Sequence, residues 1–290
     1  MYREIAPPPA LRGLVECLWV ARPTGPTRVL PDGCMDLLLD GGDLDRGDLN
    51  GGDLDGGDVD RGGLGGAGGA AAGGALGRGL TVAGPDTTAF LAGNTAGRLT
   101  AGLRFHPGAL PRLLGVPASE VRDSRVPLAE LSPVAARLTS VAARRTARRS
   151  LAEDPLGPGP RSSFDRAYSG EAFALVAALA AGEERPETAP WSRAEMRGVT
   201  RLLARGAEVR EVAAELGRTE RTLARQCAAI YGYGPSVLRR VLRFRRAAGL
   251  LHAGVAPAEV AVRVGYADQP HLTRETRALA GTTPAALRRA

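Results

Sequence analysis

The sequence predicts an α+β N-terminal domain, consisting of a small β-rich part plus helices, followed by an all-α domain. Two observations support this fold class. The first half contains short apolar stretches suited to strands, whereas the last third contains a helical unit that occurs twice. The charge divides in the same place: from Trp191 onward 18 arginines accompany 8 acidic residues, while the first 190 residues carry a net charge of −3. A basic segment attached to an acidic remainder is typical of a nucleic-acid-binding domain.

The duplicated unit spans Glu208 to Pro235 in its first copy and Ala258 to Pro284 in its second. The copies align on Gly217 and Gly265, and each contains apolar residues at the spacing of a short amphipathic helix before its glycine. A glycine permits the positive φ that ends a helix and turns the chain. We therefore predict two helix-turn-helix units, at about 208–232 and 257–281, joined by a helix over 235–251.

Each second helix is expected to begin after a capping residue, Thr219 in the first unit and Asp268 in the second. The joining helix carries one apolar face and many arginines around the rest of its surface. At 1.5 Å per residue it is about 25 Å long. Such a helix suits two reading heads placed about 34 Å apart on successive major grooves of one duplex.

The domain boundaries follow from composition and periodicity. Residues 1–181 form the predicted regulatory domain, 182–191 a linker and 192–290 the DNA-binding domain, which opens with a helix from about 192 to 205. The expected strands of the first domain lie within 14–21, 27–40, 80–92 and 98–108, and in the last of these Leu99, Ala101, Leu103 and Phe105 alternate inward. Its expected helices lie at 106–116, about 133–152 and about 163–181.

A Gly- and Asp-rich insertion with a period of five occupies residues 41–79. It resembles a pentapeptide repeat, but five units provide few neighbours with which to bury a core. A disordered insertion is the favoured interpretation, because this composition buries too little apolar surface to offset chain entropy. A short β-solenoid coil and an ion site are the alternatives.

The C-terminal third resembles the paired helix-turn-helix module of the AraC/XylS family of bacterial transcription regulators. The matching pieces are EVAAELG, the Leu223–Arg225 motif, GYGP, the helix ending RAAGLL, EVAVRVGYADQPHLTR and GTTPAALR. Pro270, Leu272 and Thr276 depart from the family pattern. In the N-terminal half, the motifs VECLWV, VLPDGCMDLLL, GLRFHPGAL and LLGVPASEV resemble an uncharacterised sensor-type domain found ahead of such modules.

The resemblance implies a sequence-specific, effector-responsive, one-component regulator that is not an enzyme. The expected DNA-binding residues lie around the two second helices: Arg218, Thr219, Arg221, Thr222, Arg225, Asp268, Gln269, His271 and Arg274. The expected phosphate contacts are Arg243, Arg246 and Arg277. Trp19, Cys34 and Phe105 are the candidate effector contacts in the first domain, while core positions for Trp19 and Phe105 and a buried, inert thiol for Cys34 are the favoured interpretations. No cofactor and no metal site is expected, since no His, Cys or carboxylate cluster has ligand spacing.

Double-stranded DNA with two adjacent major grooves is the expected partner, together with a small-molecule effector of unknown identity. RNA polymerase and a second copy of the chain are further partners that such a regulator would contact, as an activator or as a repressor. Three cysteines without CxxC spacing fit a reducing cytoplasm, and no apolar run is long enough for a membrane span. Two other functions remain open: a DNA alkylation-repair protein with a cysteine acceptor, and a non-specific architectural DNA binder.

Overall fold

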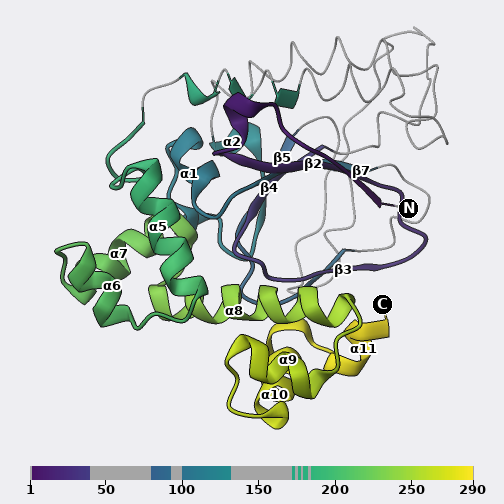
Figure 1. Cartoon of the computed structure of the whole chain (residues 1–290). Helices are drawn as coiled ribbons and strands as arrows, with labels where there is room; N and C mark the ends of the chain where they lie inside the picture. The colour runs from purple at the N-terminus through teal and green to yellow at the C-terminus, as the bar shows by residue number, and fades with distance from the viewer. Residues whose placement is uncertain are drawn as a thin grey trace, which may run out of the picture.

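The computed structural model describes residues 2–39, 80–92, 100–131, 184–289 and parts of 172–181. The predicted repeat at 41–79 and the predicted helix at 133–152 lie outside the described residues. Of the predicted helix at 163–181, the described residues 172–173, 176–177 and 179–180 are helical. The fold class is confirmed: an α+β N-terminal part precedes an all-α C-terminal part (Figure 1).

An antiparallel six-stranded sheet forms the centre of the N-terminal part, in the order β1-β2-β7-β4-β5-β8. The short strands β3 and β6 pair separately as a two-stranded ribbon, which Figure 1 shows approaching the C-terminal helices. The strands are β1 (Tyr2–Ile5), β2 (Val15–Ala21), β3 (Thr27–Val29), β4 (Met35–Leu39), β5 (Leu80–Ala83), β6 (Phe90–Ala92), β7 (Thr100–Phe105) and β8 (Arg125–Pro127).

One face of this sheet is apolar, and its centre is fully buried. Leu103 on β7 lies between Leu18 on β2 and Leu37 on β4, and all three are at most 1% exposed. The alternation predicted for β7 is confirmed, since Ala101 and Phe105 are buried on the same face. The opposite face is partly polar: Trp19 lies opposite Gly102, where an added Cβ would approach its ring to 2.6 Å. The single layer of strands thus separates an apolar environment from a partly polar one.

Short helices surround the sheet. They are the 3-10 helices at Pro9–Leu11 and Ala118–Glu120, α1 (Ala109–Leu114) and α2 (Leu128–Leu131). The C-terminal part contains α5 (Arg193–Ala204), α6 (Val209–Glu215), α7 (Glu220–Tyr231), α8 (Pro235–His252), α9 (Pro257–Val264), α10 (Gln269–Ala280) and α11 (Pro284–Arg289).

The internal duplication predicted from the sequence is confirmed element by element. Helices α6 and α7 form the first unit, and α9 and α10 form the second. The turn glycines Gly217 and Gly265 have φ of 62° and 80°. Both second helices are 12 residues long and end at a left-handed glycine, Gly232 or Gly281. A proline then opens the next helix in each copy, α8 or α11.

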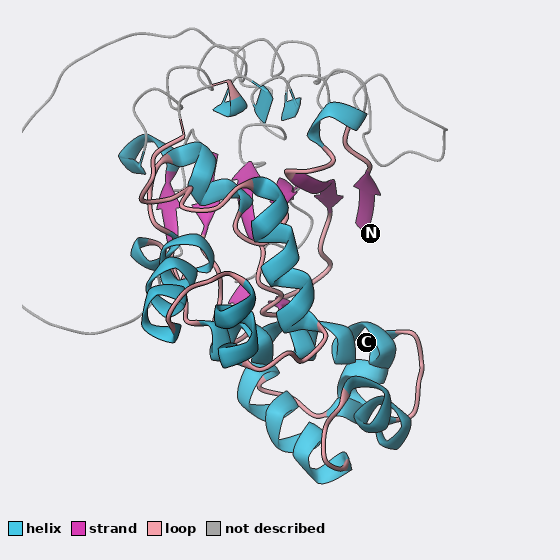
Figure 2. Ribbon diagram, turned by 60° about the vertical axis from the view of Figure 1, so that its left-hand side comes forward, coloured by secondary structure: helices cyan, strands magenta, loops and turns pink. Residues whose placement is uncertain are grey.

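The two units are built on different cores. A continuous apolar core runs from the sheet through α5, α6 and α7 to Leu242 in the first half of α8. A second core begins at Phe244, in the second half of the same helix, and contains α9, α10 and α11. Figure 2 shows the second unit as a separate group of helices near the C-terminus. Helix α8 therefore belongs to both units.

The N-terminal part packs closely on the first unit. A Cβ added to Gly108, which precedes α1, would lie 2.5 Å from Cγ2 of Ile230 on α7, and one on Gly232 would lie 2.4 Å from Cγ of Pro85. The segment predicted as a linker is packed as well: Trp191 is 1% exposed, and its carbonyl accepts a 2.7 Å hydrogen bond from the buried Arg112. Residues 184–187 of this segment are exposed, so it is its last part, from Thr188 to Trp191, that packs against the folded parts.

Candidate nucleic-acid interface

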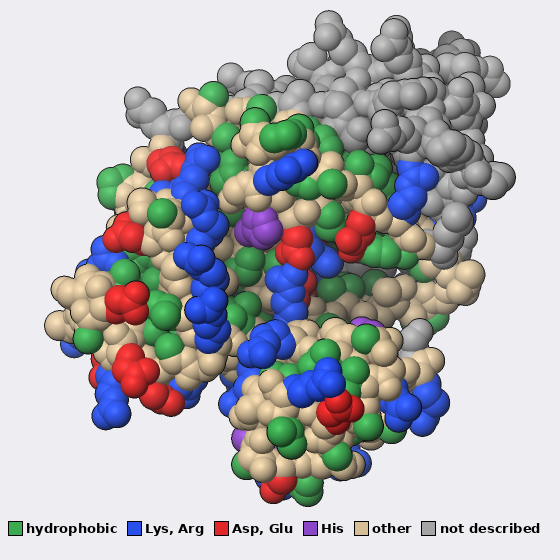
Figure 3. Space-filling model, viewed as in Figure 1, with side chains coloured by type: hydrophobic (Ala, Val, Ile, Leu, Met, Phe, Trp, Pro, Cys, Tyr) green, Lys and Arg blue, Asp and Glu red, His purple; other side chains and the backbone are tan. Residues whose placement is uncertain are grey.

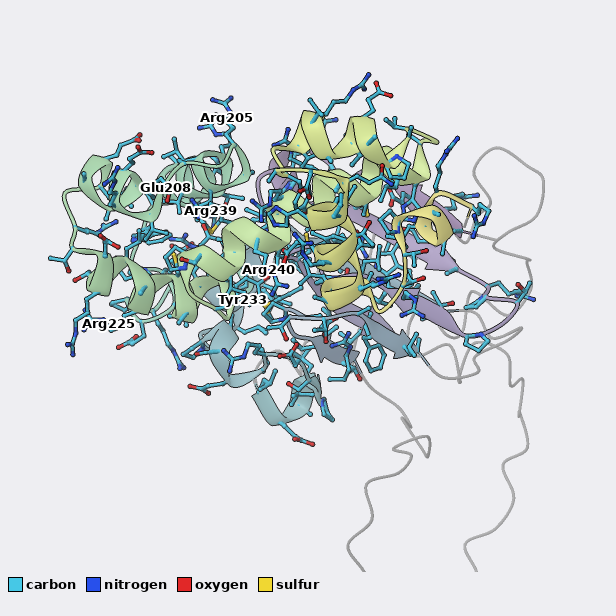
Figure 4. The ribbon with its side chains drawn as sticks, turned by 90° about the horizontal axis from the view of Figure 1, so that it is seen from below. Arg205, Glu208, Arg225, Tyr233, Arg239 and Arg240 are labelled. Carbon is cyan, nitrogen blue, oxygen red and sulfur yellow. The ribbon has the colours of Figure 1, made fainter. Side chains whose placement is uncertain are left out.

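The second helix of the first unit, α7, presents two unpaired arginines to solvent. Arg221 and Arg225 are exposed and four residues apart, so they lie on one face of the helix. Neither has an ion-pair or hydrogen-bond partner among the described residues. Figure 4 shows Arg225 projecting away from the outer end of this unit. The opposite face of α7 holds Leu223, Cys227 and Ile230 in the core.

Other predicted residues of the first unit hold the structure together. The Thr219 hydroxyl caps α7 by accepting a hydrogen bond from the backbone N–H of Thr222, which confirms the predicted cap. The Arg218 guanidinium lies 5.6 Å from the ring centroid of Trp191 and 3.7 Å from the carboxylate of Glu195. Contact of Arg218, Thr219 and Thr222 with DNA stays a prediction.

In the second unit, too, some of the predicted residues hold the structure together, while others are exposed and have no partner among the described residues. Asp268 caps α10, since its carboxylate accepts a 2.5 Å hydrogen bond from the backbone N–H of His271, as predicted. The His271 ring contacts the ring of Tyr266 edge-on, with centroids 5.1 Å apart. Gln269 and Arg274 are exposed, and their side chains have no partner within the described part of the chain. Arg274 aligns with Arg225 in the duplication.

Helix α8 carries arginines that mostly contact the protein itself. Arg243 stacks over Tyr266, 4.6 Å from its ring centroid. Arg246 is exposed, and it donates a 3.0 Å hydrogen bond to the carbonyl of Ala204 at the end of α5. Arg277, on α10, is exposed. The phosphate contacts predicted for these three residues stay predictions; the structure gives Arg243 and Arg246 intramolecular partners.

Positive charge also gathers on a surface that the sequence prediction did not include. Arg197, Arg201 and Arg205 recur every fourth residue along α5 and are exposed. Figure 3 shows a column of arginines in the region where Figure 1 places α5. The spacing of four was visible in the sequence and was the signal for a charged helix face.

The predicted effector residues are not brought together. Phe105 is fully buried on the core face of the sheet, whereas Trp19 lies on the opposite face, where its Nε1–H donates to Asp36 at 3.2 Å. Cys34 is buried at the end of the turn before β4, with its Sγ 3.3 Å from Nη1 of Arg245 on α8. An effector-binding role for the three residues stays a prediction.

Burial makes the thiols poor nucleophiles. Desolvation, followed by the nearby charge of Glu4, raises the pKa of Cys17 to about 12. Burial likewise raises the pKa of Cys34 well above its ordinary value, with Asp32 adding to the effect. A thiolate is the reactive form of cysteine. These environments do not favour a methyl-accepting cysteine at either position.

Two contacts from the ribbon β3–β6 hold the end of α10, and nothing in the sequence indicated them. Nη1 of Arg28 donates to the carbonyl of Ala280 at 2.6 Å, and the backbone N–H of Ala89 donates to the carbonyl of Leu279 at 2.7 Å. These carbonyls belong to the last turn of α10, where intrahelical partners are lacking. A third contact joins α8 to the sheet, since Arg245 forms an ion pair with Glu16. The N-terminal part therefore touches both units.

The described residues contain no group of His, Cys, Asp and Glu side chains that could hold a metal ion. Within the same residues, no helix combines the length and the apolar composition that crossing a bilayer requires.

Comparisons with known proteins divide the chain in two. Residues 3–127 match the family model described as a domain of unknown function, DUF6597, and residues 198–290 match a model described as a helix-turn-helix domain. No curated protein sequence matches the chain.

Among solved structures, the chain is similar to ToxT from Vibrio cholerae O395, with 10% identity and a TM-score of 0.38 over 72% of this chain and 77% of that chain. A second ToxT structure from Vibrio cholerae has 8% identity and a TM-score of 0.38, covering 99% of this chain and 97% of that one. At these TM-scores, no residue assignment in this protein rests on the likeness.

Proposed function

We propose that the chain is a DNA-binding transcriptional regulator that binds a specific bipartite operator and responds to an effector; the match of residues 198–290 to a helix-turn-helix family model supports this. In this proposal, α7 and α10 enter two successive major grooves of one duplex. The exposed Arg221 and Arg225 of α7, and Gln269 and Arg274 of α10, contact base edges. The protein acts in the cytoplasm and catalyses no reaction.

The observation that carries the proposal is the equivalence of Arg225 and Arg274. They occupy the same place in two copies of one structural unit, each on the exposed face of a capped second helix, and each without a partner among the described residues. Arginine presents a planar fork that binds O6 and N7 of guanine in a bidentate manner. A solubilising role would not require the same position in both copies.

The contacts between the N-terminal part and both units support effector control. The first unit shares its core with the sheet, and the second is held through Arg28 and Ala89 on or beside the β3–β6 ribbon. A ligand that shifts this ribbon would change the orientation of α10 relative to α7, and allosteric coupling requires such differential contacts. Of the three predicted effector residues, Trp19 lies on the partly polar face of the sheet, and we propose that face as the place of binding.

Operator fragments selected from genomic DNA with the wild-type protein provide the test. Replacing Arg225 by alanine should weaken binding to the selected fragments by about 1–3 kcal/mol and relax sequence preference at one position. Arg205→Ala is the matched control, because Arg205 is exposed but Figure 4 shows it on a different side of the first unit. Equal affinities for wild type and Arg225→Ala at every salt concentration would exclude a reading role for this arginine.

The same measurement separates the regulator from an architectural DNA binder. A sequence-specific regulator binds its site about 10³- to 10⁷-fold more tightly than bulk DNA at physiological salt. An architectural binder would show no such ratio, because phosphate contacts supply essentially all of non-specific binding. A ratio close to one for every selected fragment would therefore contradict the proposed function.

A further inference from the structure

The two reading units share a helix but not a hydrophobic core. The first core ends on α8 at Leu242, and the second begins two residues later at Phe244. Apolar packing therefore fixes each unit to its own half of α8. No apolar core runs from one unit to the other, so apart from α8 itself the angle between α7 and α10 depends on polar contacts that cross between the units. Two readers on one duplex must keep this angle, because both helices have to fit grooves of fixed spacing.

Polar contacts cross between the halves of α8. Arg240 lies in the half that packs on the first core, yet its Nε donates to the Glu275 carboxylate of α10 at 2.8 Å. Arg243 places Nη2 3.9 Å from the same carboxylate. The Glu275 side chain is 17% exposed, although it sits between the exposed Arg274 and Arg277 along the helix. It faces α8 rather than the solvent side of α10.

The residue before Arg240 on α8 makes the corresponding contact with the first unit. Arg239 forms a 2.8 Å ion pair with Glu208, the residue that caps α6 in the first unit. Successive residues of a helix point about 100° apart, so neighbouring arginines reach different neighbours. Figure 4 shows Arg239 near Glu208 and Arg240 farther along the same helix, toward the second unit. One turn of α8 is thereby tied to both units.

Arg243 extends the contact to the start of α10. Its guanidinium stacks over Tyr266, in the turn before α10, and the Tyr266 ring meets His271 in the first turn of α10. Helix α10 is therefore held at two points: through Tyr266, in the turn before its first residue, and through Glu275, in its middle. Partly buried, charge-assisted hydrogen bonds have a more fixed geometry than exposed ion pairs.

We infer that Glu275 is a positioning residue for the second reading helix, held by Arg240 and Arg243 so that α7 and α10 keep the spacing of a bipartite operator. Glu275 does not read DNA itself. The inference rests on the proposed function for its DNA readout, but the geometry it asserts exists without DNA.

The DNA-free test measures the distance between α7 and α10 in the full-length protein. Spin labels are placed on Glu220→Cys and Ala278→Cys, both exposed positions, while the native cysteines are buried. Pulsed electron spin resonance should give a narrow distance distribution, which broadens when Glu275→Gln is added. The control is Glu259→Gln, which also removes one negative charge from the second unit but whose partner Arg263 lies on its own helix. Identical distributions for Glu275→Gln and Glu259→Gln would overturn the inference.

The DNA test uses operator fragments selected with the wild-type protein, and variants of them with inserted base pairs between the half-sites. Glu275→Gln should bind the intact operator about five- to tenfold more weakly, bind the isolated second half-site with unchanged affinity, and lose the preference for one spacing. The exchange Arg240→Glu with Glu275→Arg should restore part of the affinity, because Arg243 still faces the exchanged side chain. An equal loss on half-site and intact operator, or no rescue by the exchange, would show that Glu275 supports only folding. If the wild type selects no fragment, the proposed function fails, while the spin-label distances still decide the role of Glu275.

Discussion

At the scale of residues, the largely buried carboxyl group of Asp36 should make the free energy of unfolding depend on pH. Asp36 accepts hydrogen bonds from Trp19 at 3.2 Å and from Arg104 at 3.3 Å. Burial raises the pKa of Asp36 to about 6, with Asp32 adding to the rise and Arg104 partly offsetting it. The folded protein therefore holds this proton more tightly than the unfolded chain, in which an aspartate has a pKa of about 3.9.

The contribution of Asp36 is fully present below about pH 4 and is lost as pH rises through about 6, since the folded state then gives up a proton that it favours. Relative to Asp36→Asn, the free energy of unfolding of the wild type should fall by about 2 kcal/mol between about pH 4 and pH 7. Urea unfolding of both proteins across this range measures it. Parallel pH profiles would show that Asp36 ionises as freely in the folded state as in the unfolded chain.

The sequence predicted which residues would lie on and beside the reading helices, but not which of them would be free of intramolecular contacts. Arg218, Thr219 and Asp268 all occur at the start of a reading helix, and in the structure each also has an intramolecular partner. Periodicity cannot separate a capping side chain from one that faces DNA, because both sit just before the helix. Phe105 was predicted to face inward from the alternation in its strand, and it does, but only strand register shows that Trp19 lies on the other face of the sheet, opposite Gly102. That distinction depends on pairing between strands far apart in the chain.

At the scale of elements, the duplicated unit was the most predictable part of the fold. Apolar spacing, turn glycines and caps are local signals, and α6, α7, α9 and α10 match their predicted ranges closely. The contacts of α7 with the N-terminal part, and of α10 with the β3–β6 ribbon, were not predictable. They join residues as distant as Arg28 and Ala280, and no local pattern records them.

The cap of α10 offers a prediction that separates structure from DNA contact. Asp268→Ala should lower the free energy of unfolding by about 1 kcal/mol, because the backbone N–H of His271 loses its acceptor. Asp268→Asn keeps a good capping side chain and should leave stability almost unchanged. Thermal unfolding measures stability, and binding to a selected operator measures DNA contact. A large loss of DNA affinity in Asp268→Asn at unchanged stability would assign Asp268 to the DNA surface instead.

At the scale of the whole molecule, the two units are held by the N-terminal part in different ways. The first unit is joined to the sheet by a common core, while the second is joined to the ribbon by hydrogen bonds to two carbonyls of α10 and by the partly buried Leu30 directly after β3. A shared core resists displacement because it cannot open without exposing apolar surface. The second unit is therefore the part of the DNA-binding domain that a change in the N-terminal part can move.

Because the two units are held differently, removing the Arg28 side chain should change amide exchange in the second unit only. Arg28→Ala removes the hydrogen bond to the Ala280 carbonyl, so backbone amide exchange should quicken in the last turn of α10 and in α11. Exchange in α7 should stay as in the wild type, because its contacts lie in the shared core. Hydrogen–deuterium exchange with peptide resolution measures both regions, and Thr24→Ala, at an exposed position before the ribbon, is the control. Equal acceleration in α7 and α10 would contradict the asymmetry.

The most direct measurement of the central claim is a hydroxyl-radical footprint of the full-length protein on a selected operator. Two reading helices on successive major grooves should protect two patches of backbone on one face of the duplex, about 10 base pairs apart. The patch from α7 should weaken in Arg225→Ala, and the patch from α10 in Arg274→Ala. A single protected patch, or two patches on opposite faces of the duplex, would contradict the account.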